Sequence, residues 1–187
     1  NSPEWAIIDL ACISVGIVIV PIPPFFSETQ KEWVRASASI DAQIGGESMS
    51  GWHRHDFPFG KLQVRQLTAP TSLPVGTSKI TFTSGTTGEP KGVCVVHRGL
   101  LNLLLDMQRT FAVGSQDRLL SVTTPTFDIS FLEYLLPLIS GASLYLTEAE
   151  RAADSFRMIP LSADYRPTLM QATPSFWHGL LMAGWRG

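Results

Sequence analysis

The sequence is poor in charge, because only 16% of its 187 residues are Asp, Glu, Lys or Arg, against about 25% in an average soluble domain. Its 14 basic and 16 acidic side chains leave a formal net charge of −2. This balance excludes a general electrostatic attraction to nucleic acid or to an anionic membrane. Since 44% of the residues are hydrophobic, intrinsic disorder is excluded as well. So little charge indicates that part of the surface is covered within a larger protein.

Cysteines and long apolar runs are also scarce. Cys12 and Cys94 are too few for a disulfide framework and form no C-x-x-C pair, so we expect buried free thiols. The longest apolar run, residues 10–26, is interrupted by three prolines and falls short of the roughly 20 residues of a membrane helix. A signal peptide requires a basic segment before its apolar run, and no such segment precedes residues 10–26. We therefore expect a cytoplasmic chain that binds neither membrane nor nucleic acid.

Turn residues and hydrophobic periodicity predict alternating helices and strands. Residues 2–14 are typical of a helix, residues 17–20 of a buried strand, and Ser27 to Gln30 match a capping box that begins a helix to about residue 39. Residues 45–59 are loop-like. Further strands are expected at 62–67 and 79–82, and then strands and helices alternate over 93–96, 98–111, 118–122, 129–139, 143–146, 149–161, 168–172 and 173–184. This order predicts an α/β fold, layered, with a largely parallel β-sheet and helices on both faces.

One segment, TSGTTGEPKG from Thr83 to Gly92, concentrates hydroxyls, glycines and a lysine. Glycine lets the main chain approach an anion, hydroxyls donate to phosphate oxygens, and Lys91 adds a positive charge. It is not a Walker A loop, because Gly85 and Gly88 are only two residues apart and Pro90 precedes the lysine. The alternative is a flexible loop with a solvated lysine.

The ordered string resembles the phosphate-binding signature of adenylate-forming enzymes, the superfamily of acyl-CoA synthetases, luciferases and nonribosomal peptide synthetase adenylation domains. Residues 124–133 (TPTFDISFLE) resemble the Phe-Asp-x-Ser segment of the nonribosomal domains. Residues 170–175 (MQATPS) are similar to the strand–helix step before those domains' central nucleotide-binding motif. The resemblance covers residues 2–187, although residues 21–27 and 79–94 look more like acyl-CoA synthetase sequence. The character of the sequence changes near Val95 and Val96, which suggests a hybrid or an unusual branch.

Members of this superfamily join an acid to ATP with Mg²⁺, forming an acyl adenylate and pyrophosphate, and a thiol usually takes the acyl group. The resemblance thus implies ATP and Mg²⁺, an amino acid or other carboxylic acid as substrate, and a phosphopantetheine carrier or CoA as thiol acceptor. No metal-binding residue is predicted in this chain, and His53 to His55 are expected to be a solvated loop. The residues that the resemblance assigns to the β- and γ-phosphates are Thr83, Ser84, Gly85, Thr86, Thr87, Gly88 and Lys91.

The acid is assigned to a second set of residues. In adenylation domains for α-amino acids, the aspartate that matches Asp128 pairs with the substrate ammonium. The alternative is that Asp128 caps the helix expected from Ile129. Ile129, Leu132 and Gln171 match positions that select the substrate side chain, and their alternative is ordinary packing in the core or sheet.

The family's central Tyr-Gly-x-Thr-Glu segment, ribose-binding aspartate, hinge and mobile C-terminal domain have no counterpart in the sequence. We therefore expect residues 1–187 to be a partial N-terminal adenylation domain, with a sub-region boundary near residues 69–78 and an incomplete catalytic set. The chain alone is expected to be inactive. The alternatives to an amino-acid ligase are an acyl-CoA synthetase-type ligase of a non-amino acid, and a non-catalytic fragment with a retained phosphate-binding loop.

Overall fold

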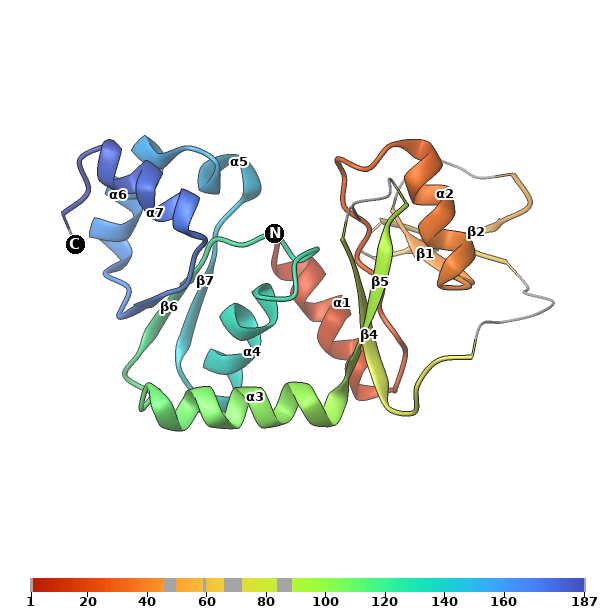
Figure 1. The fold of residues 1–187 in the computed structure, drawn as a ribbon, viewed down its shortest axis with the longest axis horizontal. Coiled ribbons are helices and arrows are strands. Elements are labelled where there is room, and N and C mark those ends of the chain that lie inside the picture. The colour runs from red at the N-terminus through yellow and green to blue at the C-terminus, as the bar shows by residue number, and fades with distance from the viewer. Residues whose placement is uncertain (1, 46–49, 59, 66–71, 84–88, 187) are drawn as a thin grey trace. The chain divides into compact units, whose positions relative to one another are not determined.

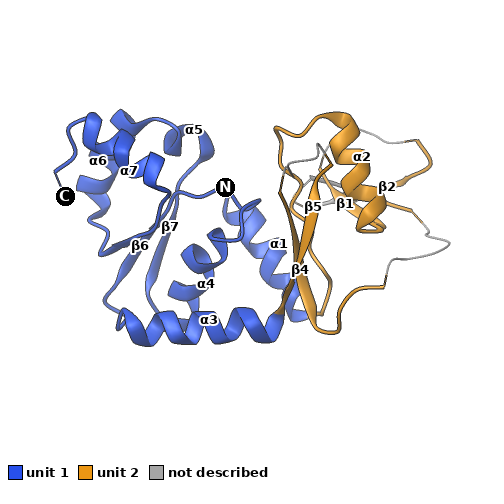
Figure 2. Ribbon diagram, viewed as in Figure 1, with its two compact units in different colours: residues 1–14, 97–187 blue, residues 15–96 orange. Residues whose placement is uncertain are grey.

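Figure 1 shows the computed structural model, which describes residues 2–45, 50–58, 60–65, 72–83 and 89–186. The chain forms two compact units, coloured separately in Figure 2: unit 1 comprises residues 1–14 and 97–187, and unit 2 comprises residues 15–96. Helices and strands occur in both units, so the α/β class is confirmed. The sub-region boundary expected near residues 69–78 stays a prediction. The compact units themselves separate after residue 14 and after residue 96.

A helix and a two-stranded hairpin form the core of unit 2. Helix α2 (Glu28–Ser37) begins at the predicted capping box: the Ser27 hydroxyl accepts a hydrogen bond from the Gln30 amide, and the Gln30 side chain accepts one from the Ser27 amide. Strands β4 (Thr77–Thr83) and β5 (Lys91–Val96) pair antiparallel. The buried side chains that gather between helix and hairpin are Phe26, Val34, Ile80 and Phe82.

At Gly92 the main chain of β5 lies close to the Phe82 side chain of β4. Gly92 lies opposite Phe82 in the register of β4 and β5. A Cβ atom at Gly92 would lie 2.9 Å from Cζ of Phe82 and 3.1 Å from Cγ2 of Ile80. The Phe82 ring therefore occupies the space that any side chain at Gly92 would need, and the residue type here is fixed by packing.

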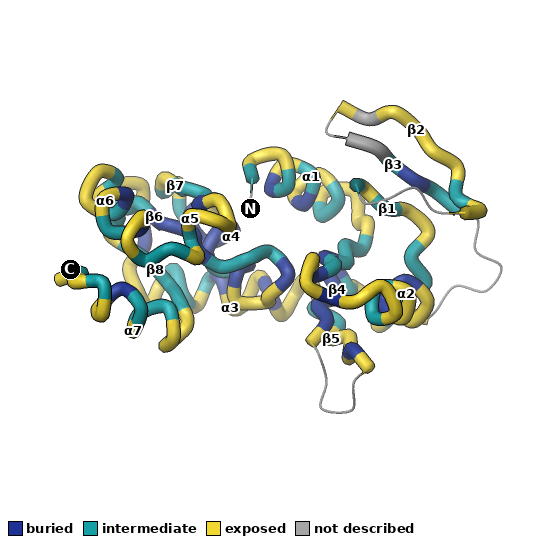
Figure 3. Tube along the Cα trace, turned by 90° about the horizontal axis from the view of Figure 1, so that it is seen from above, coloured by how far each residue is buried: buried dark blue, intermediate teal, exposed yellow. Residues whose placement is uncertain are grey.

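The rest of unit 2 contains a small antiparallel sheet that the sequence did not fully predict. Its strand order is β1 (Ala42–Ile44), β3 (Gly60–Val64), β2 (His53–Phe57). Residues 45–59 were expected to be a loop, and the β2 segment within them is instead a strand. The reason is main-chain pairing with β3, which an edge strand can make while its residues stay exposed. Figure 3 colours residues 53–56 of β2 as exposed.

Unit 1 is built on a parallel sheet with the strand order β7–β6–β8. Parallel pairing among the described residues is confined to this sheet and one isolated bridge, because the other strand pairs are antiparallel. Leu120 of β6 packs with Met158 of α6 and Leu180 of α7, while α4 contacts β6 and β7. None of the described helices is long and apolar enough to span a membrane. The elements of unit 1 are α1 (Pro3–Ser14), α3 (His97–Thr110), β6 (Arg118–Ser121), α4 (Ser130–Ser140), β7 (Ser143–Leu146), α5 (Ala149–Ala152), α6 (Ser155–Tyr165), β8 (Leu169–Met170) and α7 (Pro174–Met182).

The single helix expected over residues 149–161 is divided into α5 and α6. Asp154 causes the division, because its carboxylate accepts hydrogen bonds from the amides of Phe156 and Arg157 and so caps the start of α6. At the end of α4, Gly141 adopts a left-handed conformation with φ of 69°, which glycine accommodates without strain and which ends the helix.

A buried polar contact attaches α1 to the rest of unit 1. The Tyr134 hydroxyl on α4 donates a hydrogen bond to the Asp9 carboxylate on α1, and both residues are almost completely buried. The Trp5 ring meets the Tyr134 ring edge-on, with 5.1 Å between centroids. Burial and the Asp9 charge raise the pKa of the Tyr134 hydroxyl, so it stays protonated and able to donate.

A buried glutamate anchors the end of the central strand. Oε2 of Glu133 on α4 accepts hydrogen bonds from the Ser121 hydroxyl at 2.9 Å, the Val122 amide at 2.8 Å and the Thr123 amide at 2.9 Å. The side chain is inaccessible to solvent, and Oε1 has no hydrogen-bond partner among the described residues. Burial raises the pKa of the Glu133 carboxyl, and the bonds from Thr123, Ser121 and Val122 offset that rise only in part.

The raised pKa of Glu133 predicts a specific pH dependence of stability. A carboxyl whose pKa is higher in the folded state stabilises the fold fully below its unfolded pKa of about 4.3, and this contribution is lost as the pH rises through the folded value. Glu133→Gln abolishes the titration. We therefore expect the free energy of unfolding of the unmodified protein, relative to Glu133→Gln, to be highest near pH 4 and to fall toward pH 7 in urea titrations. Glu150→Gln is the control, because Glu150 is exposed. If the free energy of unfolding depended on pH in the same way in both variants, the pH dependence could not be assigned to Glu133.

The Phe82–Gly92 contact predicts that a single methyl group destabilises the hairpin. Gly92→Ala forces the Phe82 ring or the strand to move, and overpacking of this kind typically costs about 1–3 kcal/mol. Gly114→Ala is the matched control, because nothing lies within 4 Å of a Cβ there and its φ is not positive. Denaturant unfolding should give a lower midpoint for Gly92→Ala and little change for Gly114→Ala. Equal midpoints for the two variants would show that the ring does not restrict this position.

Candidate functional site

The β4–β5 hairpin brings the two ends of the predicted phosphate loop together. Thr83, the last residue of β4, lies directly opposite Lys91, the first residue of β5. Directly opposed residues point to the same face of an antiparallel pair, and both of these are exposed. The hairpin therefore presents a hydroxyl beside an ammonium at the end where residues 84–90 connect its two strands. Residues Ser84, Gly85, Thr86, Thr87 and Gly88 lie outside the described residues.

A tryptophan contacts the chain immediately before Lys91. The indole Nε1 of Trp33, on α2, donates a hydrogen bond of 3.0 Å to the carbonyl oxygen of Pro90. The Trp33 side chain is not part of the core, because 42% of its surface is exposed. The contact joins residues 57 positions apart. The sequence carries no signal for it, since the helical pattern places Trp33 on α2 without identifying its partner.

The predicted acid-binding segment is a short turn between β6 and α4. The Phe127 amide donates to the Thr124 carbonyl at 3.1 Å, and the Ser130 hydroxyl donates to the Phe127 carbonyl at 2.7 Å. Helix α4 begins at Ser130, and its cap residue is Ile129, which makes no side-chain capping bond. Asp128 is therefore not the helix cap that the alternative interpretation required. Its carboxylate is exposed and makes no hydrogen bond or ion pair within the described part of the chain.

A long-range hydrogen bond brings Gln171 to this turn. The amide Nε2 of Gln171, which follows β8, donates to the main-chain carbonyl of Ile129 at 3.0 Å. The Ile129 side chain is exposed, and Leu132, in the first turn of α4, is partly buried. Unit 1 thus places Gln171 beside the Asp128–Ile129 turn. The substrate roles of these residues stay predictions.

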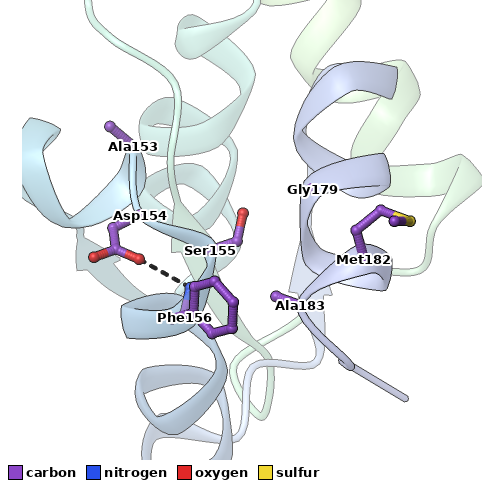
Figure 4. A pocket seen from close by; sticks show the side chains of 7 residues that line it. All are labelled: Ala153, Asp154, Ser155, Phe156, Gly179, Met182 and Ala183. Atoms are coloured by element: carbon purple, nitrogen blue, oxygen red, sulfur yellow. Dashed lines mark hydrogen bonds between the residues drawn. The ribbon is translucent and has the colours of Figure 1, made fainter.

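A pocket in unit 1 holds none of the predicted residues. It has a volume of about 370 Å³ and lies between the start of α6 and α7, as Figure 4 shows. Its one carboxylate, Asp154, is already engaged in capping α6. The pocket is a gap between two packed helices and offers no uncommitted carboxylate, so we do not assign substrate binding to it. Its lining residues are Ala153, Asp154, Ser155, Phe156, Gly179, Met182 and Ala183.

Metal-binding clusters are absent from the part of the chain that the structure describes. No group of three or more His, Cys, Asp or Glu residues there could hold a metal ion. His53 and His55 lie on the exposed edge strand β2 rather than in a loop.

Comparison with known proteins identifies the family. A family model described as AMP-binding enzyme matches residues 1–186. The chain is 34% identical over 194 residues to a dimodular nonribosomal peptide synthase of Bacillus subtilis (strain 168), covering 97% of this chain and 8% of that protein. The chain therefore spans less than a tenth of that relative.

Solved structures agree with this fold. A crystal structure of a four-domain nonribosomal peptide synthetase bound to AMP and glycine superposes with a TM-score of 0.78 at 23% identity, covering 100% of this chain and 14% of that one. The Vibrio cholerae adenylation domain AlmE, in complex with glycyl-adenosine-5′-phosphate, gives a TM-score of 0.52 at 26% identity over 57% of this chain and 20% of that one.

The match of the family model over almost the whole sequence agrees with the relative, the fold and the adenylate-forming signature recognised in the sequence. The chain belongs to the family of AMP-binding enzymes, which are AMP-forming ligases, and is similar to part of a nonribosomal peptide synthase.

Proposed function

We propose that this chain takes part in the ATP-dependent activation of an amino acid as its aminoacyl adenylate. In this reaction a carboxylate oxygen of the amino acid attacks the α-phosphorus of ATP. The new oxygen–phosphorus bond forms as the bond to the β-phosphate oxygen breaks, and the electron pair leaves with pyrophosphate. The activated acyl group then passes to a thiol, either on a phosphopantetheine carrier or on CoA.

The carboxylate of Asp128, which is exposed and makes no hydrogen bond or ion pair with the described residues, is the observation that carries the choice of an amino acid. A carboxylate used as a helix cap would already be satisfied by main-chain amides, as Asp154 is on α6. Asp128 instead keeps its charge available beside the Ile129 main chain that Gln171 holds. A substrate ammonium is the complementary partner for such a group. The glycyl adenylate bound by AlmE supports the same substrate class.

The proposed role of Lys91 and Thr83 is to bind the β- and γ-phosphates together with residues 84–88. An ammonium and a hydroxyl side by side at the end of the hairpin supply a charge and a donor to phosphate oxygens. In phosphoryl and nucleotidyl transfer the protein acts mainly by positioning the phosphates and stabilising their charge. Lys91 therefore acts by neutralising charge on the departing pyrophosphate.

Removing the Lys91 charge should weaken the use of ATP. In the full-length protein we expect Lys91→Ala to lower kcat/KM for ATP by about 100-fold, the size of effect typical for one electrostatic group in a transition state. ATP–pyrophosphate exchange with the best amino acid of a screened set measures this. Lys31→Ala is the control, since Lys31 pairs with Glu28 on α2 of the same unit. A Lys91→Ala variant with unchanged kinetics would refute the phosphate-binding assignment.

Removing the Asp128 charge should affect amino acids selectively. For the full-length protein we expect Asp128→Asn to lower kcat/KM for the amino acid by about 30- to 1000-fold, as expected when one partner of a desolvated charge pair is lost. The analogue that lacks the α-amino group should be affected little. Asp106→Asn, an exposed aspartate on α3, is the matched control. Equal losses for the amino acid and its analogue would favour a ligase of non-amino acids.

A further inference from the structure

We infer that Trp33 is a positioning residue for Lys91, acting through the carbonyl group of Pro90. The inference rests on the proposed function, because it assumes that Lys91 binds the phosphates of ATP. It adds a residue from α2 to the ATP-binding machinery, and nothing in the motif from Thr83 to Gly92 points to that helix.

The hydrogen bond from Trp33 has no simple substitute. Proline has no amide hydrogen, so the carbonyl is the only hydrogen-bonding group of the Pro90 main chain. Pro90 is buried, and buried carbonyl groups are costly to leave without a donor. The indole of Trp33 can only donate, which matches this acceptor. The contact fixes the main chain one residue before Lys91.

Packing in the core of unit 2 sets the position of the indole. Val34, the next residue on α2, is completely buried and packs in the cluster that contains Ile80 and Phe82 of β4. The capping box at Ser27 defines where α2 begins. Since the helix is held by these contacts, Trp33 itself does not need to be buried, and its ring extends to Pro90 while partly exposed.

Lys91 is thus held from both sides. Trp33 fixes the preceding residue, and on the other side the Phe82 ring lies against Gly92. The register of the hairpin fixes Lys91 itself opposite Thr83. The Lys91 side chain stays exposed. These contacts therefore fix the main chain from which the side chain extends and leave its ammonium group unoccupied. Positioning of this kind lowers the entropy that must be lost when the ammonium binds an anion.

The test compares Trp33→Phe with Lys91→Ala and the double variant in the full-length protein, using ATP–pyrophosphate exchange. Phenylalanine keeps an aromatic ring and removes only the N–H donor. We expect Trp33→Phe to raise KM for ATP about 3- to 10-fold, the equilibrium change that corresponds to one net hydrogen bond. KM for the amino acid should stay unchanged. Trp52→Phe is the matched control, because Trp52 also lies in unit 2 and stacks beneath Arg65.

The double variant separates positioning from general destabilisation. If Trp33 acts through Lys91, adding Trp33→Phe to Lys91→Ala should cause no further rise in KM for ATP. The inference is overturned if the effect of Trp33→Phe is absent, is equally large without Lys91, or raises KM for both substrates alike. An unchanged KM for ATP in Lys91→Ala would instead refute the proposed function, so the two failures are distinguishable. Thermal unfolding of each variant identifies any loss of folded protein.

Discussion

The register of the β4–β5 hairpin is the constraint on which the arrangement of unit 2 depends. Moving one strand by a single residue would turn every side chain to the opposite face. Phe82 would then leave the core it shares with Val34, and Gly92 would no longer lie beneath its ring. The same register sets Thr83 against Lys91. A packing requirement in the core therefore determines which two residues meet at the exposed end of the hairpin.

In unit 1 a buried carboxyl group, that of Glu133, holds the main chain at the end of β6. The carboxyl of Glu133 gathers the Val122 and Thr123 amides, which leave the sheet where β6 ends and would otherwise lack strand partners. The segment that follows runs directly into the turn containing Asp128. A glutamate in the core thus organises the main chain that leads to an exposed aspartate.

Local features could be predicted from the sequence, whereas features that need a distant partner could not. The capping box at Ser27 depends on residues three positions apart, so its pattern was sufficient. Strand β2 forms because β3 pairs with it, and its own polar composition gave no indication of this. The role of Gly92 could be read only once Phe82 was placed opposite. The proposed acid-binding residues were assigned through resemblance to a family motif, and only the structure placed Gln171 beside Ile129.

The division into units has a consequence for how such chains diversify. The main chain passes between the units at only two places, after Ser14 and after Val96. Each described sheet lies wholly within one unit. Recombination between related genes at those two points would exchange residues 15–96 as a block, with every β-ladder of the donor intact. The first point follows the end of α1, and the second lies between the last residue of β5 and the first residue of α3, so an exchange at these points would leave every helix and strand uncut.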